Sequence, residues 1–245
     1  MKIKVLLVVF SILSWPTYLH SQNIEHEGEA WIGYIGSFRT SDHWSLWFDF
    51  HFVPETFVVP RVGLSYHAGQ HWRLTAGYAY ARTSTAYSHR LLRGEHRPWA
   101  QAEARYKLSK KFNYRLRLRY DARFRDQLLP QSESSTGNYQ LINRWRILND
   151  IRFDLKSWQQ QKLQAVLMDE LLFNSGENIT NALDQNRIYA LLAWQIQPGL
   201  SLNTGYHLRQ IPRSNNRYTF RHGITLWFIH QLDLRKKSKA PSNTP

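Results

Sequence analysis

The stretch RLRLRYDARFR, residues 115–125, separates charged from apolar residues completely. Its odd positions are all arginine or aspartate, and its even positions are leucine, tyrosine, alanine or phenylalanine. A period of two is typical of an extended strand whose two faces meet different surroundings, because successive side chains of a strand point in opposite directions. A helix would instead scatter the arginines around its circumference. The stretch therefore predicts a β-strand with one charged and one apolar face.

The same alternation recurs along the chain and predicts roughly eleven strands of about 9–14 residues each. Short turns and long polar loops alternate strictly from residue 57 onward, which is typical of an outer-membrane β-barrel. No Pro- or Ser-rich linker divides the chain, so we expect one domain. The candidate strands are 30–38, 44–52, 57–67, 72–82, 97–108, 114–125, 142–155, 162–173, 186–197, 200–209 and 217–232.

Eleven is an unusual strand number, because bacterial barrels generally have an even one. We therefore expect about ten or twelve strands. Either a further strand lies near residues 23–30, or the 30–38 segment does not join the wall.

The alternation does not by itself say which face points inward, because a membrane barrel reverses the arrangement of a soluble one. Aromatic residues gather near the strand ends of the apolar register, as in the girdles of membrane barrels, and the polar register mixes both signs of charge. One arginine on a lipid face costs roughly 2–4 kcal/mol, so Arg115, Arg117 and Arg119 must face the lumen of a membrane barrel. We predict an all-β fold: a single antiparallel transmembrane β-barrel of about 10–12 strands with a polar lumen and an apolar, aromatic outer face. A soluble secreted β-barrel that binds an acidic ligand is the alternative.

The two ends of the chain differ from this pattern. Lys2 and Lys4 precede a short apolar run at 5–13, the layout of a secretory signal peptide. We therefore divide the chain into a signal peptide (1–21), a barrel domain (22–234) and a flexible basic tail (235–245), with export to a bacterial outer membrane. Cysteine is absent, which excludes disulfides.

The formal net charge of +14 raises the question of an acidic partner. Basic residues form no consecutive block before RKKSK in the tail, so we expect no binding to nucleic acid. The expected partners are outer-membrane lipid and small anions in the lumen. The oligomeric state stays open.

The order of several short motifs is similar to that of a known family. The motifs are RVGLSYHAGQHWRLTAGYAYA, GEHRPWAQ, RLRLRYDARF, DELLFN and DQNRIYALLAW. From residue 29 to about 232 the chain resembles the Gram-negative outer-membrane barrels grouped as domain of unknown function 2490. The resemblance implies a barrel in the outer membrane and no assigned activity.

The charges of the polar register are the candidate functional residues. They form a lumen charge ladder that either makes an anion-selective constriction or ligand site, or pairs internally to fill the barrel. Glu95 and His96 lie where the first long loop meets a strand, and could bind a ligand or fix the loop. The ladder comprises Arg97, Glu103, Arg105, Arg115, Arg117, Arg119, Asp121, Arg144, Arg146, Asp150, Arg152, Asp154 and Glu170.

The sequence has no phosphate-binding glycine loop, nucleophile elbow or metal-ligand spacing, so we name no catalytic residue and expect no cofactor and no metal. His222 and Asp169 fall in apolar registers. A strand bulge would explain both, and a position near the membrane interface would also explain the histidine. An outer-membrane lipid-modifying enzyme is the functional alternative.

We expect a barrel of unassigned biochemical activity, either a narrow anion-preferring channel or an architectural barrel with a charged, largely filled lumen. About ten to twelve strands make a lumen far narrower than that of an open porin. Strands 97–107, 115–125 and 144–154 carry ten inward arginines against four acids. We therefore expect water and a positive potential along this wall, because an unpaired charge in a dry interior is costly.

Overall fold

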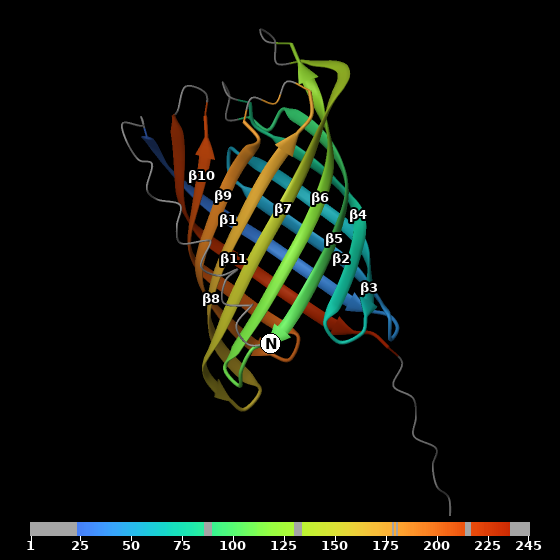
Figure 1. Cartoon of the computed structure of the whole chain (residues 1–245), viewed down its shortest axis with the longest axis vertical. Coiled ribbons are helices and arrows are strands. Elements are labelled where there is room, and N and C mark those ends of the chain that lie inside the picture. The colour runs from blue at the N-terminus through green and yellow to red at the C-terminus, as the bar shows by residue number, and fades with distance from the viewer. Residues whose placement is uncertain are drawn as a thin grey trace, which may run out of the picture.

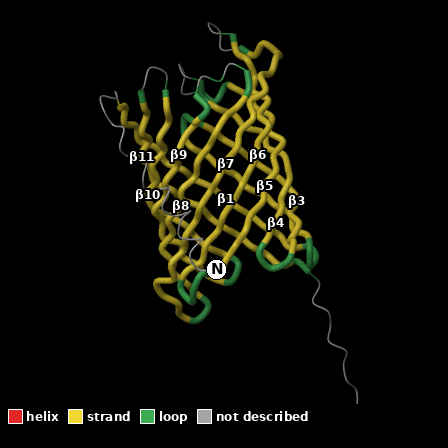
Figure 2. Tube along the Cα trace, in the orientation of Figure 1, coloured by secondary structure: helices red, strands yellow, loops and turns green. Residues whose placement is uncertain are grey.

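The computed structural model describes residues 24–85, 90–129, 134–177, 179, 181–213 and 217–235. Within them the chain forms one closed β-barrel, seen from the side in Figure 1 and as a bare trace in Figure 2. The proposed signal peptide and all but the first residue of the proposed tail lie outside the described residues.

The described residues form eleven strands, one for each strand predicted from the alternation, and most of them are longer than predicted. The strands are β1 (Ile24–Arg39), β2 (Trp44–Val53), β3 (Phe57–Ala68), β4 (Trp72–Thr83), β5 (Arg93–Lys107), β6 (Phe112–Leu128), β7 (Ser135–Trp158), β8 (Gln161–Ser175), β9 (Leu183–Gln197), β10 (Leu200–Pro212) and β11 (Tyr218–Asp233).

The barrel closes through a parallel pair. Every strand pairs antiparallel with its neighbour in sequence, and β1 closes the wall by pairing with β11 in parallel, from Ile24↔Tyr218 to Arg39↔Asp233. An up-and-down barrel with an odd strand number has first and last strands of the same direction, so its closing pair must be parallel. The expectation of an even strand number is therefore wrong. The two explanations offered for the count of eleven, a further strand near residues 23–30 and a 30–38 segment outside the wall, are wrong as well. Residues 24–30 begin β1, and the 30–38 segment does join the wall.

The two ends of the barrel carry different connections. We call the end with the β1–β2, β3–β4, β5–β6, β7–β8 and β9–β10 connections the turn end, at the bottom of Figure 1, and the opposite end the loop end. Gly199 shows why these turns are tight: its φ is +82°, and a Cβ there would lie 2.2 Å from the carbonyl oxygen of Gln231. Only glycine fits such a position without strain.

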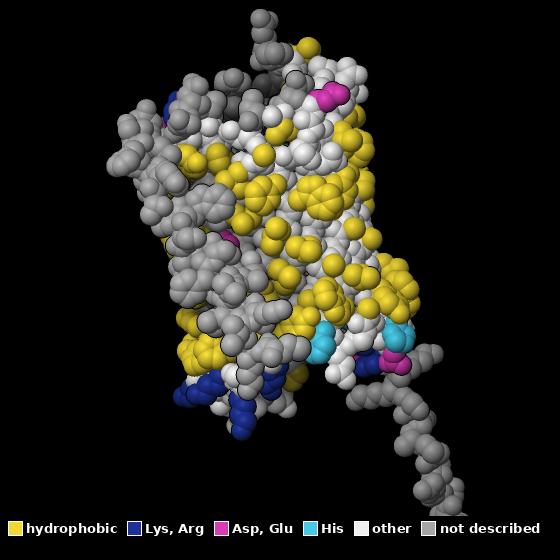
Figure 3. Space-filling model, viewed as in Figure 1, with side chains coloured by type: hydrophobic (Ala, Val, Ile, Leu, Met, Phe, Trp, Pro, Cys, Tyr) yellow, Lys and Arg dark blue, Asp and Glu magenta, His cyan; other side chains and the backbone are white. Residues whose placement is uncertain are grey.

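The two registers of each strand face opposite sides of the wall, as predicted. Leu118 on β6 is 49% exposed, whereas its neighbour Arg119 is 5% exposed and points into the lumen. Hydrophobic side chains spread over the wall between the two ends in Figure 3. The barrel is thus apolar outside and charged inside.

The part of the chain that the structure describes contains no helix that is long and apolar enough to cross a membrane.

Candidate functional site: the arginine-lined lumen

In the part of the chain that the structure describes, one cavity leads into the lumen from each end of the barrel. The one at the loop end has a volume of about 1350 Å³, and the one at the turn end has a volume of about 520 Å³. Trp31, Arg61, Arg146 and Arg187 line both cavities, so these four side chains mark the level at which the cavities meet.

Aromatic side chains fill one side of the lumen at this level. Trp31 is 4% exposed, and its Nε1 donates a hydrogen bond to His51 Nδ1 at 3.1 Å. Five other rings lie with their centroids 5.3–6.1 Å from the Trp31 ring, at steep angles that favour contact of ring edge with ring face. We call these six side chains the aromatic septum: Trp31, His51, Phe57, Tyr189, His207 and Trp227.

Arginines approach the septum from the lumen. The Arg187 guanidinium lies 5.0 Å from the centre of the Trp31 ring, and that of Arg209 lies 5.8 Å from it. Such cation–π contacts favour the positive charge next to a ring face. At this level the lumen therefore combines packed aromatic rings with guanidinium groups.

Glu170 on β8 is the central acid of the lumen. Its Oε1 accepts hydrogen bonds from Arg117 Nη2 at 2.6 Å and from Arg146 Nη2 at 2.7 Å. Its Oε2 lies 3.4 Å from Arg187 Nη1. Three strands, β6, β7 and β9, thus direct one arginine each at a single carboxylate.

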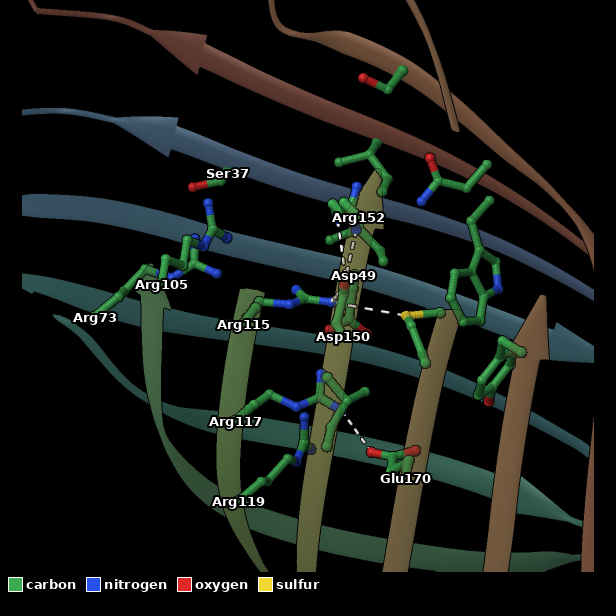
Figure 4. A pocket seen from close by; sticks show the side chains of 18 of the residues that line it. Ser37, Asp49, Arg73, Arg105, Arg115, Arg117, Arg119, Asp150, Arg152 and Glu170 are labelled. Atoms are coloured by element: carbon green, nitrogen blue, oxygen red, sulfur yellow. Dashed lines mark hydrogen bonds and ion pairs between the residues drawn. The ribbon is translucent and has the colours of Figure 1, made fainter. Parts of the chain in front are cut away.

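A second network lies toward the turn end (Figure 4). Glu103 forms ion pairs with Arg73 at 2.9 Å and with Arg105 at 2.7 Å. Arg115 joins Glu103 to Asp150, with Nη1 3.4 Å from Glu103 Oε2 and Nη2 2.5 Å from Asp150 Oδ2. Acids on alternate strands therefore share arginines, which distributes the positive charge along the wall.

The residues of the predicted charge ladder, with the exception of Asp154, are buried inside the barrel or line the two cavities. Asp121 pairs with Arg119 at 2.5 Å, and Asp150 also pairs with Arg152 at 3.1 Å. Asp154, near the turn end, pairs instead with Lys162 at 2.7 Å.

Several charged residues of the lumen escaped the sequence analysis. Asp184 forms an ion pair with Arg144 at 2.9 Å, and Glu29 on β1 accepts from Arg209 Nη1 at 2.7 Å. Their strands show a weaker alternation, yet each charge does lie in the inward register. Other buried charges outside the predicted ladder include Arg61, Arg73, Arg187 and Arg209.

Glu95 and His96 do not form one site at the rim. Glu95 is buried in the lumen, where Arg97 and Arg123 donate hydrogen bonds to it. His96 points to the outer face, where its ring hydrogen-bonds with the Tyr78 hydroxyl. Successive residues of a strand face opposite sides, so adjacency in sequence separates these two side chains.

Comparison with known protein families shows which family this chain belongs to. The family model described as "Protein of unknown function (DUF2490)" matches residues 28–220. The chain belongs to this family. No curated protein matches it.

Two solved structures are similar to this family member. The NanC porin, in a rhombohedral crystal form, has a TM-score of 0.45 and 14% identity, over 81% of this chain and 98% of that one. The ferric-catecholate import receptor Fiu from K12 E. coli, in a closed form, has a TM-score of 0.28 and 12% identity, over 74% of this chain and 40% of that one.

Asp169 and His222, the two polar side chains that the sequence places in apolar registers, do not lie at bulges. The pairing of β8 is regular on both sides of Asp169, which is 8% exposed, because its register shifts lie further along the strands. The Nε2 atom of His222 lies 2.8 Å from Nδ1 of His26, and its Nδ1 atom lies 2.6 Å from the Tyr206 hydroxyl oxygen. The pairing of β11 is also regular on both sides of His222, so the bulge explanation is wrong for both residues. Among the described residues, no three His, Asp or Glu side chains are grouped so that they could hold a metal ion.

Proposed function

We propose that the barrel spans the outer membrane of a Gram-negative bacterium, with the loop end outside and the turn end in the periplasm. Exposed apolar side chains on successive outward positions support this setting. On a soluble protein, an apolar surface of this extent would be a site of association with other molecules. The arginines lie inside the barrel, so they do not make its outer surface more polar. The chain should fractionate with outer membranes and show a heat-modifiable gel shift in detergent. Recovery in the soluble periplasm without that shift contradicts the proposal.

We further propose that the lumen is a narrow passage that prefers small anions. The observation that carries this proposal is that Arg61, Arg146 and Arg187 line both cavities at the level where they meet. Rings of arginine in a low-dielectric channel favour anions, because the walls focus the field of the positive charges into the lumen.

The loop-end cavity has the charge that such a passage needs. Twelve arginines and four glutamates line it among the described residues, so incoming solutes meet a positive potential. The aromatic septum limits the free cross-section, and we therefore expect a small conductance rather than that of an open porin.

Reversal potentials in planar bilayers test this function. Across a KCl gradient, the refolded protein should give small current steps whose reversal potential lies toward the chloride equilibrium potential. The double variant Arg146→Gln with Arg187→Gln should shift that potential toward potassium. The matched control, Arg235→Gln with Lys162→Gln, removes two positive charges that do not lie where the two cavities meet and should leave the potential unchanged.

Either of two results contradicts the passage. A cation preference in the unmodified protein would show that the arginines do not set selectivity. A correctly folded protein without any current would instead indicate an architectural barrel.

A further inference from the structure

A group of five charges lies near the loop end, on the inner faces of β5 and β6. We call Arg93, Arg97, Arg123, Arg125 and Glu95 the vestibule cluster. Glu95 lies directly opposite Arg125 in the strand pairing, and Arg93 and Arg97 flank it on the same face of β5. The cluster holds four positive charges and one negative charge.

Glu95 neutralises only part of this cluster. Its Oε1 accepts a hydrogen bond from Arg97 Nε at 2.6 Å and another from Arg123 Nε, and its Oε2 accepts from Arg123 Nη2 at 3.0 Å. Both oxygens are thus occupied by two of the four arginines. Glu95 is fully buried, so its partners are fixed in position.

Arg93 and Arg125 are the unpaired members. Neither forms an ion pair or a side-chain hydrogen bond with another described residue, and the Nε of each is buried without a partner. Arg123 and Arg93, which have the same charge, lie near Arg125, and the nearby acid Glu95 is already bonded to other arginines. Buried donors without acceptors are rare in folded proteins, and each calls for an explanation such as an ion.

Asp184 on β9 does not supply a negative charge to Arg93 or Arg125. It pairs instead with Arg144, at 2.9 Å. Both Arg93 and Arg125 line the loop-end cavity of about 1350 Å³, which is wide enough for a small solute to reach them.

We infer that the vestibule cluster binds a phosphate-type dianion, either free phosphate or the phosphate group of a small solute. Guanidinium groups offer planar pairs of N–H donors that match phosphate oxygens, and charge-assisted bonds of this kind are strong. Two guanidiniums without acceptors match a group with two negative charges better than a monoanion. This inference deepens the proposed function by naming the class of anion that the loop end would bind first.

Calorimetric titration of the refolded protein in detergent micelles tests the site without any need for conduction. Inorganic phosphate should bind saturably over a chloride background. Arg93→Gln with Arg125→Gln should weaken that binding about tenfold or more, because two charge-assisted contacts are lost. Binding of a phosphate monoester should also weaken as the pH falls through about 6, because the dianion takes up a proton there and becomes a monoanion.

The matched control removes the same charge from the other side of the same cavity. Arg213 donates to Thr219 Oγ1, and Arg217 is exposed between β10 and β11. Arg213→Gln with Arg217→Gln should leave the phosphate affinity nearly unchanged. A heat-modifiable gel shift in both double variants establishes that each has folded.

The source of the phosphate follows from a parallel titration with glucose 6-phosphate. Tighter binding of the ester supports a phosphorylated solute, and equal binding supports free phosphate. The inference is overturned if the unmodified protein shows no saturable phosphate binding, or if both double variants lose affinity equally. A barrel that binds phosphate and does not conduct leaves this site standing and removes the proposed passage, whereas a conducting barrel without phosphate binding does the reverse.

Discussion

Replacing Glu170 with glutamine should destabilise the barrel by about 3 kcal/mol, the lower end of the cost of breaking a buried ion pair. The Glu170 carboxylate is 2% exposed and lies within 3.4 Å of donors from Arg117, Arg146 and Arg187. Glutamine keeps one acceptor oxygen but loses the charge, so Arg117 and Arg187 lose their ion-pair partner, and Arg146 keeps only Asp121, 3.8 Å away. Water in the turn-end cavity, which Glu170 lines, offsets part of the loss. Leucine at the same position should cost more, because it removes the last acceptor.

Equilibrium unfolding by denaturant in lipid vesicles measures this change. Nine of the ten tryptophans lie in the barrel domain and provide the fluorescence signal, and linear extrapolation yields the free energy of unfolding in water. The matched control is Glu177→Gln, which makes the same chemical change in the exposed β8–β9 loop and should shift stability by less than about 0.5 kcal/mol. If Glu170→Gln shifts it as little, the lumen arginines are hydrated rather than held by the acid, and the reasoning fails.

Three further predictions use the same preparation. Leu118→Arg should cost roughly 2–4 kcal/mol of unfolding free energy under the proposed membrane setting, and a neutral effect contradicts an outward Leu118. Trp31→Ala should cost about 3–5 kcal/mol and should also raise the conductance, because it removes the centre of the septum; an unchanged current argues against the septum as the barrier. Gly77→Ala should destabilise by about 1–3 kcal/mol, because its Cβ would lie 2.0 Å from the Val62 carbonyl oxygen, whereas Gly28→Ala meets nothing within 4 Å and should be neutral in the same denaturation curve.

The strands and their faces follow from the sequence because each wall residue meets one of two unlike surroundings. Residues 114–125 record that contrast at every position, and the structure confirms both the strand and the direction of its side chains. Residues 25–29 carry the same signal in weaker form, with three glutamates alternating with His26 and Gly28. The start of β1 was missed because histidine and glycine do not stand out as an apolar register.

The pairing within the lumen is less predictable. Counting charges on three neighbouring strands overstated the local excess of arginine, because Asp184 on β9 also pairs with Arg144. The pairing of acids with arginines depends on strand register and on the curvature of the wall. The alternation of polar and apolar residues gives no information about either. The parallel closure of β1 on β11 joins segments about 190 residues apart, so no local pattern reports it.

The aromatic septum illustrates a different limit. On β9, the inward Tyr189 and Leu191 alternate with the outward Ile188 and Leu192, so both registers are apolar. Periodicity cannot assign such a strand to its faces. Only the neighbouring Arg187, in the same register as Tyr189, indicates which side is the lumen.

Labelling of single cysteines along β6 tests the central claim most directly, because the chain has no cysteine of its own. The claim is that odd positions of β6 face a water-filled, positively charged lumen and that even positions face lipid. In reconstituted vesicles, Arg117→Cys should react with a small anionic thiol reagent. A fluorophore attached at Leu118→Cys should be quenched by spin-labelled lipid. The Leu118→Cys thiol should not react with the anionic reagent in the water. The reverse pattern, or equal labelling of the two positions, would contradict the account.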